Sequence, residues 1–356
     1  MTSSRDLKSI IRERQRKTGE SYTAARVHVM RDRAQLLGIQ DNPPVAEPRP
    51  VVDAVALKVG IGSTARIRII GEADQVTLRS RDVSALAPGH VVTLRIEKRW
   101  TYRGDAYASG KIEGVRIDVG KLGLEPLSLA GGELMNLREH YEHVREPDPY
   151  TPLWRALTAK PRRWYEMNGI AWGAFPGDDR DGSPTCDAAE LAEDGDLDGA
   201  RELVMDTLLR DLRCLDAHAH LGSQLFDRSP ARALVHYEIG VRIGELSLPE
   251  GFDGVLPWSG LYNRPLLRCM HGYGLCLWRL GRVDEAIQVF ERILAFNPND
   301  NQGARFCWYD ARQGTTWKQA QDQERAETAQ RTAAVRKVRA ARPRRVAPRN
   351  SEPSVN

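Results

Sequence analysis

Histidine and clustered acidic residues are the side chains of this sequence most able to bind a metal. His140 and His143 form an H-x-x-H on a predicted helix, but no third ligand is evident near them, so a solvated helix face is favoured. His218 and His220 stand two residues apart and point to different helix faces. The acidic run at residues 178–181 does not match the ligand spacing of a calcium loop. We therefore expect no metal site.

Nucleophiles and phosphate-binding glycines also lack the partners that chemistry requires. The glycines of residues 60–64 have neither the lysine nor the following helix of a phosphate loop. The five cysteines form an odd count without a C-x-x-C, which argues against a disulfide framework and a zinc knuckle. No nucleophile–base pair is recognisable. The sequence predicts a protein that is not an enzyme and needs no cofactor.

Composition and charge limit the kinds of partner that the protein is expected to bind. No apolar stretch approaches the roughly 18 residues of a membrane span, so we expect a cytoplasmic protein without a membrane partner. The net charge of +4 conceals two basic ends, because residues 1–38 carry nine Lys or Arg against four Asp or Glu, and residues 312–356 carry eleven against four. Such ends suit nucleic acid or another acidic partner, and they equally suit solvated tails.

The first half of the chain divides into a helical hairpin, a linker and a strand region. Residues 1–38 predict two basic helices separated by a left-handed stop at Gly19 and a capping hydroxyl at Ser21. Simple helix packing is favoured there over a DNA-reading helix-turn-helix. A Pro-rich linker covers residues 39–50. Five segments of alternating apolar and polar residues within 51–130 then predict a small antiparallel β barrel or sandwich.

The second half predicts a connector followed by helices. Residues 131–186 read as an irregular connector in which Trp154, Trp164 and Trp172 are pinned by aromatic burial. Residues 187–323 predict paired helices with a final capping helix. Residues 324–356 form a basic tail that begins as a helix and ends in a Pro- and Ser-bearing segment expected to be disordered.

Small and bulky residues recur in register within the helical part. Gly274, Ala286, Phe290 and Pro298 are separated by 12, 4 and 8 residues. Gly222, Ala233 and Tyr237 repeat this order with the second helix one residue early, and Ala200 with Val204 fits an earlier unit. A loop rich in Gly and Pro, residues 244–263, accounts for the extra spacing before the last unit.

This pattern resembles the tetratricopeptide repeat, a 34-residue helix–turn–helix unit. Residues 211–222, 263–281 and 297–303, and more weakly Lys98-Arg99-Trp100, are also similar to a group of bacterial repeat proteins of uncharacterised function. The resemblance implies an α-solenoid and no reaction. The fold class expected is therefore α+β multidomain, with an N-terminal helical hairpin, a small β barrel or sandwich and a C-terminal solenoid.

Stacked helical hairpins present the first helix of each unit on a concave face, where peptides or partner helices bind. Position by position, the resemblance places eight residues in that groove: Asp216, Ala219, Ser223, Phe226, Arg268, His271, Leu275 and Trp278. The lysine and asparagine of a carboxylate clamp are absent from the matching positions. We expect a protein or peptide partner, and the loop at 244–263 is a candidate for covering the groove.

One patch of the strand region suggests a different partner. Lys98, Arg99, Trp100, Tyr102 and Arg103 interleave aromatic and basic side chains, as in sites that stack and neutralise single-stranded nucleic acid. A hairpin with aromatic cross-strand pairs is the favoured alternative. The sequence therefore predicts a binding adaptor that uses the helical groove, and offers a nucleic-acid-associated adaptor as a second possibility.

Overall fold

The computed structural model describes residues 4–36, 50–60, 62–140, 149–177 and 183–341. It contains two compact units, residues 1–51 and 52–356. The expected linker at 39–50 and the expected disorder at the end of the tail fall almost wholly outside the described residues. No described helix combines the length and the apolar character needed to traverse a lipid bilayer.

The first unit is the predicted helical hairpin. Helices α1 (Ser4–Thr18) and α2 (Tyr22–Leu36) pack through a small core of Ile11, Ala25 and Val29. Gly19 between them adopts a left-handed φ of 69°, and Ser21 Oγ accepts a hydrogen bond from Ala24 N at 3.3 Å. The turn therefore has the geometry that its residues predicted.

The second unit begins with a closed five-stranded barrel. Its strands are β1 (Val51–Val59), β2 (Thr64–Ile69), β3 (Gln75–Arg79), β4 (His90–Tyr102) and β5 (Asp105–Ile117), in the order β1-β2-β3-β5-β4. Buried side chains alternate along β2 and β3, whereas β1 buries four consecutive residues, Ala54–Leu57. The five segments predicted from the sequence form the five strands.

The barrel is not purely antiparallel, which corrects the sequence prediction. β3 pairs with β5 in parallel, with Thr77 opposite Tyr107, while β1–β2, β2–β3 and β4–β5 are antiparallel. The cause is the link between β3 and β4, which contains the short 3-10 helix η1 (Val83–Ala85) and does not form a hairpin. The following β4–β5 hairpin then leaves β5 beside β3.

The connector contains more regular structure than its sequence suggested. After η2 (Val119–Lys121), strand β6 (Leu129–Met135) pairs with β7 (Arg162–Met167), and α3 (Leu137–His140), α4 (Thr151–Leu157) and η3 (Gly169–Trp172) complete it. The expected irregularity at 131–186 is thus corrected by a two-stranded sheet. The two glycines Gly131 and Gly132 do not indicate a strand in the sequence. Gly132 is nevertheless required in β6, because a Cβ atom on it would lie 1.9 Å from the Trp164 ring.

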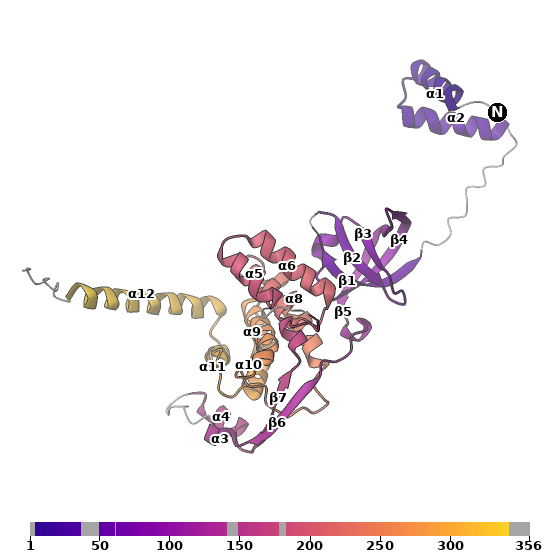
Figure 1. Ribbon diagram of the computed structural model, residues 1–356. Coiled ribbons are helices and arrows are strands. Elements are labelled where there is room, and N and C mark those ends of the chain that lie inside the picture. The colour runs from indigo at the N-terminus through magenta and orange to yellow at the C-terminus, as the bar shows by residue number, and fades with distance from the viewer. Residues whose placement is uncertain (1–3, 37–49, 61, 141–148, 178–182, 342–356) are drawn as a thin grey trace, which may run out of the picture. The chain divides into compact units, whose positions relative to one another are not determined.

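Eight helices follow in the described residues. They are α5 (Pro184–Glu193), α6 (Leu197–Arg210), α7 (Leu215–Phe226), α8 (Pro230–Glu245), α9 (Arg264–Arg279), α10 (Val283–Phe296), α11 (Ala304–Arg312) and α12 (Trp317–Ala341), with η4 (Leu261–Asn263) before α9. Helices α5 to α11 contact one another in chain order, and α12 contacts α9 and extends away from the rest (Figure 1). The first helices of successive pairs also touch, since α7 contacts both α5 and α9.

Glycines at the recurring positions let these helices approach closely. A Cβ atom on Gly222 of α7 would lie 2.6 Å from the Tyr237 ring of α8, and one on Gly274 of α9 would lie 2.7 Å from the Phe290 ring of α10. Each pair therefore packs a bulky ring of its second helix against a glycine of its first helix.

Loop 244–263 joins the connector to the helices. Val255 exchanges hydrogen bonds with β7, donating to Arg163 O and accepting from Tyr165 N, and Leu256 N donates to Phe296 O. The buried guanidinium of Arg162 donates to three carbonyl oxygens, those of Asp253, Gly254 and Ala295. These bonds hold the loop against β7.

Candidate functional site

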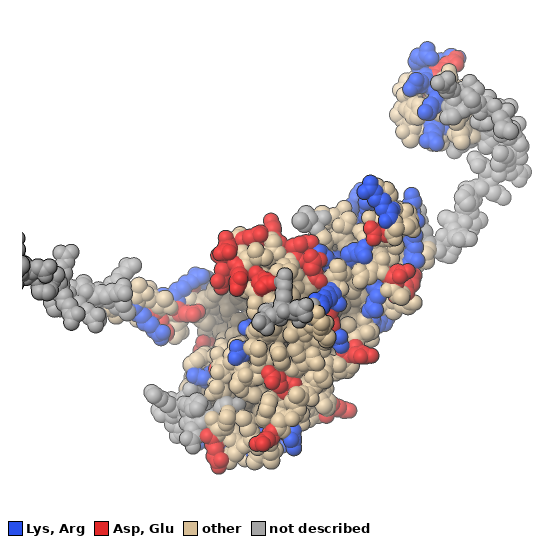
Figure 2. All heavy atoms as spheres, in the orientation of Figure 1, with Lys and Arg blue, Asp and Glu red and all other residues tan. Residues whose placement is uncertain are grey.

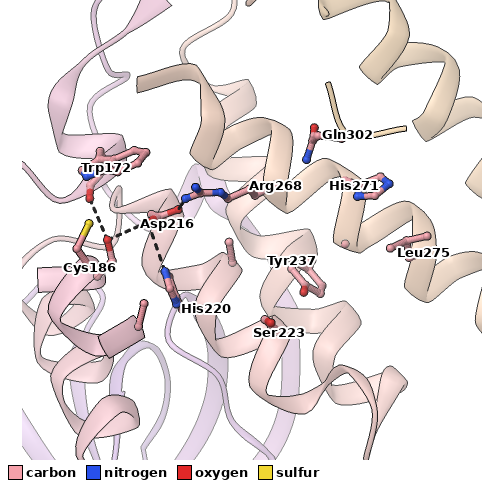
Figure 3. Close-up of a pocket in the computed structure, with 14 residues that line it drawn as sticks. Trp172, Cys186, Asp216, His220, Ser223, Tyr237, Arg268, His271, Leu275 and Gln302 are labelled. Atoms are coloured by element: carbon pink, nitrogen blue, oxygen red, sulfur yellow. Dashed lines mark hydrogen bonds and ion pairs between the residues drawn. The ribbon is translucent and has the colours of Figure 1, made fainter. Parts of the chain in front are cut away.

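A cavity of about 430 Å³ opens among α5, α7 and α9 (Figure 3). Side chains from all three helices, from η3 and from the segment after α10 line it. The lining residues are Trp172, Thr185, Cys186, Ala189, Asp216, Ala219, His220, Ser223, Tyr237, Arg268, His271, Gly272, Leu275 and Gln302. Loop 244–263 contributes no residue to this lining.

Asp216 is the centre of the polar network in this cavity. It lies in the first turn of α7, where the helix dipole favours a carboxylate, and it is only 1% exposed. Arg268 Nη1 donates to its Oδ1 at 2.7 Å, and Thr185 Oγ1 donates to its Oδ2 at 2.8 Å. His220 Nε2 lies 3.5 Å from Oδ2, one helical turn along. Figure 3 shows Arg268 and His220 approaching the carboxylate from different sides.

The partners keep Asp216 ionised although it is buried. Burial by itself would raise the pKa of this carboxyl group, but the hydrogen bond from His220 and the charge of Arg268 lower the pKa below its ordinary value. The resulting ion pair joins α7 to α9, and the buried charge holds the Arg268 side chain in place.

Two tryptophan rings complete the surroundings of Arg268. Its guanidinium carbon lies 5.2 Å from the centre of the Trp172 ring and 5.9 Å from that of Trp258. The side chain is 37% exposed, and only one of its N–H groups is used by Asp216. Arg268 is therefore an oriented cation with donors left over for a ligand.

Two further polar atoms in the lining have no partner. His271 Nε2 and Gln302 Oε1 are both buried and neither takes part in a hydrogen bond. Burial lowers the pKa of His271 to about 4, so its ring is neutral near pH 7. A buried polar atom without a partner is costly, and a pair of them beside one cavity indicates that a ligand or water completes their bonding.

Six of the eight groove residues predicted from the sequence line this cavity: Asp216, Ala219, Ser223, Arg268, His271 and Leu275. Phe226 and Trp278 do not. Their rings pack edge-on against Trp317 of α12, at 5.7 and 5.4 Å between ring centres. The start of α12 thus covers the part of the helical surface where these two residues lie.

Sequence reasoning missed four contributors to the site: Trp172, Thr185, His220 and Gln302. His220 was judged only as a metal ligand, although its spacing from Asp216 is the i, i+4 spacing that brings two helical side chains together. The other three come from segments outside the recurring helix positions. No spacing in the sequence relates them to the groove.

Comparison of the chain with known proteins identified no relative. No family model, no curated protein and no solved structure matches the chain. The site must be interpreted from its own geometry.

Among the residues that the structure describes, no three His, Cys, Asp or Glu side chains are grouped as a metal site requires. His143 and the acidic residues at 178–181 lie outside the described part of the chain. His218 lies apart from His220, buried with its Nε2 bonded to Leu212 O.

The aromatic and basic patch occupies the end of the β4–β5 hairpin. Trp100 stands opposite Tyr107 on β5, and their rings stack at 5.5 Å. Lys98 and Arg103 each lie over an aromatic ring of the same hairpin, while Arg99 is paired with Glu72. The cross-strand stacking that the sequence offered as an alternative is therefore present, and the patch remains on the surface.

Proposed function

We propose that the chain is a non-enzymatic adaptor that binds a peptide segment of a partner protein in the cavity between α5, α7 and α9. The observation that carries the proposal is Arg268, which is held by Asp216 and two tryptophan rings and lines the same cavity as the unpartnered Nε2 of His271 and Oε1 of Gln302. This arrangement offers fixed donors and acceptors to a bound ligand.

The lining suits a peptide. Ala189, Ala219 and Leu275 supply apolar surface, while Arg268 can donate to a carbonyl or carboxylate oxygen and Gln302 Oε1 can accept from a backbone N–H. The first helix of one pair, α7, contacts the first helices of its neighbouring pairs, α5 and α9. This arrangement supports a solenoid related to the tetratricopeptide repeat. In such a solenoid the cavity lies on the face formed by the first helices.

Trp317 packs over Phe226 and Trp278, and this limits the part of the groove along which a peptide can lie. A segment that enters beside Arg268 meets the α12 start when it continues toward the C-terminal ends of α7 and α9. We therefore expect recognition of a short segment rather than of a long helix laid through the whole groove.

Selection of displayed random peptides on the full-length protein tests this function. Peptides enriched on the wild type should bind D216N/R268Q and Leu275→Trp at least about tenfold more weakly, the first because the fixed cation is lost and the second because the cavity is filled. The double substitution removes both charges together, so that no buried charge is left alone.

Arg264→Gln is the matched control. Arg264 lies one turn earlier on α9, also contacts the Trp258 ring, and does not line the cavity. Its substitution should leave peptide affinity unchanged. Failure to enrich any peptide, or enrichment of peptides that bind all four proteins equally, would exclude the cavity as a peptide site.

A further inference from the structure

The end of the β4–β5 hairpin extends beyond the core of the barrel. Buried residues occur along β4 as far as Ile96, and from Glu97 to Tyr102 none of the side chains is buried. Arg103 and Gly104, with φ of 51° and 90°, form the tight turn that returns the chain into β5. The aromatic residues of this end therefore contribute little to the barrel interior.

Three aromatic rings are nevertheless exposed there. Tyr102 beside the turn is 56% exposed. Trp100 and Tyr107 stack with an interplanar angle of 12° and remain partly open to solvent. Rings held in this way offer flat apolar surfaces without loss of side-chain freedom when a second flat molecule stacks on them.

Three cations border the rings. Arg79 on β3 lies 5.7 Å from the Trp100 ring centre and 5.5 Å from that of Tyr107, Lys98 lies 5.7 Å from Trp100, and Arg103 lies 5.3 Å from Tyr102. Within the described residues none of these three cations forms an ion pair with a carboxylate. Their charges are thus available to an anionic partner.

The charge of the surrounding surface favours this end of the barrel for a polyanion. Figure 2 shows Lys and Arg atoms gathered where Figure 1 labels β3 and β4, while Asp and Glu atoms gather over α5 and α6. Exposed acidic residues of that helix pair include Glu190, Glu193, Asp194 and Asp198. A polyanion is attracted to the hairpin and repelled from the helix pair.

We propose that the hairpin end binds single-stranded nucleic acid, with phosphates on Arg79, Lys98 and Arg103 and bases stacked on Tyr102 and on the Trp100–Tyr107 pair. Cations alone would suit any acidic polymer, whereas exposed rings among cations favour a polymer that carries both phosphates and flat bases. A duplex buries the base faces within its own stack, so the single-stranded form is favoured.

Binding of the full-length protein to labelled oligothymidylate and oligouridylate of about 15 nucleotides tests the proposal by fluorescence anisotropy. Tyr102→Ala should weaken binding about tenfold, as expected for the loss of one base–aromatic stack, and Tyr102→Phe should retain it. Lys98→Ala with Arg103→Ala should make the slope of log affinity against log salt concentration shallower by about 1.4. Lys160→Ala with Lys318→Ala removes the same charge elsewhere and should not weaken binding comparably.

A crosslink locates the site independently of the basic ends of the chain. An oligonucleotide with 5-iodouracil should crosslink to Trp100, Tyr102 or Tyr107 when the complex is irradiated and mapped by mass spectrometry. Crosslinks confined to residues 1–36 or 317–356 would overturn the proposal. Equal affinity for polyglutamate would assign the patch to an acidic polypeptide, tighter binding of a duplex would reject single-strand recognition, and absence of any binding at low salt would reject both.

Discussion

Arg268 of α9 donates a hydrogen bond of 2.7 Å to the carboxylate of Asp216 of α7, across 52 residues of sequence. The acid is buried and the base is partly exposed, so the pair has an inner and an outer end. The inner end fastens two helices, and the outer end faces the cavity. One interaction thus serves both the packing of the helical region and the candidate site.

Removal of the cation alone should destabilise the protein. Arg268→Gln leaves a buried carboxylate without its charged partner and should reduce the free energy of unfolding by about 2–4 kcal/mol. Asp216→Asn combined with Arg268→Gln should recover most of that loss, because no charge remains buried. Urea unfolding of the two variants measures both values, and equal losses would show that the pair is not coupled.

Arg162 should be required to hold the loop at 244–263 in place. Arg162→Lys keeps the charge but cannot reach three carbonyl oxygens at once, so it should reduce the free energy of unfolding by about 2–3 kcal/mol. Lys160→Ala breaks an exposed ion pair with Asp253 next to it and should leave the urea midpoint unchanged. Similar midpoints for both variants would contradict a fastening role of Arg162.

Substitution of Gly272 tests whether the close approach of α9 to α8 is required. A Cβ atom there would lie 2.3 Å from the Tyr237 ring, so Gly272→Ala should cost about 1–3 kcal/mol of stability. Adding Tyr237→Leu should relieve the clash and recover part of the loss. Gly120→Ala meets only an Asp118 oxygen at 3.7 Å and serves as the control. A thermal midpoint for Gly272→Ala that equals the control would show that the helices can shift apart.

These contacts show which features local patterns could predict. Strands β2 and β3 followed from alternation, since each buries one face. The spacing of Gly222 and Tyr237 predicted that a small and a bulky residue recur in paired helices. Asp216 and Arg268 were both assigned to the groove, but their pairing was not predicted. Nothing in the spacing of two residues 52 apart specifies that their side chains meet.

Other features depend on contacts made only in the folded chain. Strand β6 contains two glycines, and its pairing with β7 depends on the Trp164 ring packing over Gly132. Trp317 falls within the range 187–323 predicted for the helices, and its ring covers Phe226 and Trp278. Local propensity carries no information about which distant ring fills a surface, so these residues could not be placed from sequence.

Buried histidines should make the protein sensitive to acid. Burial lowers the pKa of His90, His218 and His271 to about 4, and that of His236 well below its ordinary value. The unfolded chain takes up these protons near pH 6.5 and the folded chain does not, so stability is complete above pH 6.5 and falls as pH decreases toward 4.

The expected slope is up to about 1.4 kcal/mol per pH unit for each such histidine. His218→Gln should reduce the slope by that amount in urea titrations between pH 6.5 and 4.5. His28→Gln serves as the control, because His28 lies in the other compact unit, residues 1–51, and its replacement should not alter the unfolding of residues 52–356. A stability that does not vary over this interval would show that the buried rings become protonated without unfolding.

Trp317 should control whether α12 stays attached to the other helices. Its ring packs against Phe226 and Trp278, and Trp278 Nε1 donates to Thr315 O at 3.0 Å, whereas every side chain from residue 322 to 334 is exposed. Because the rest of α12 has so little to pack against, Trp317→Ala should release the helix start and raise amide hydrogen exchange in residues 317–330 about tenfold or more. The urea midpoint of the remaining helices should change much less. Lys318→Ala, at an 85% exposed side chain on the same turn, should leave the exchange rates as they are. Wild-type exchange rates in Trp317→Ala would mean that α12 is held by contacts other than this ring.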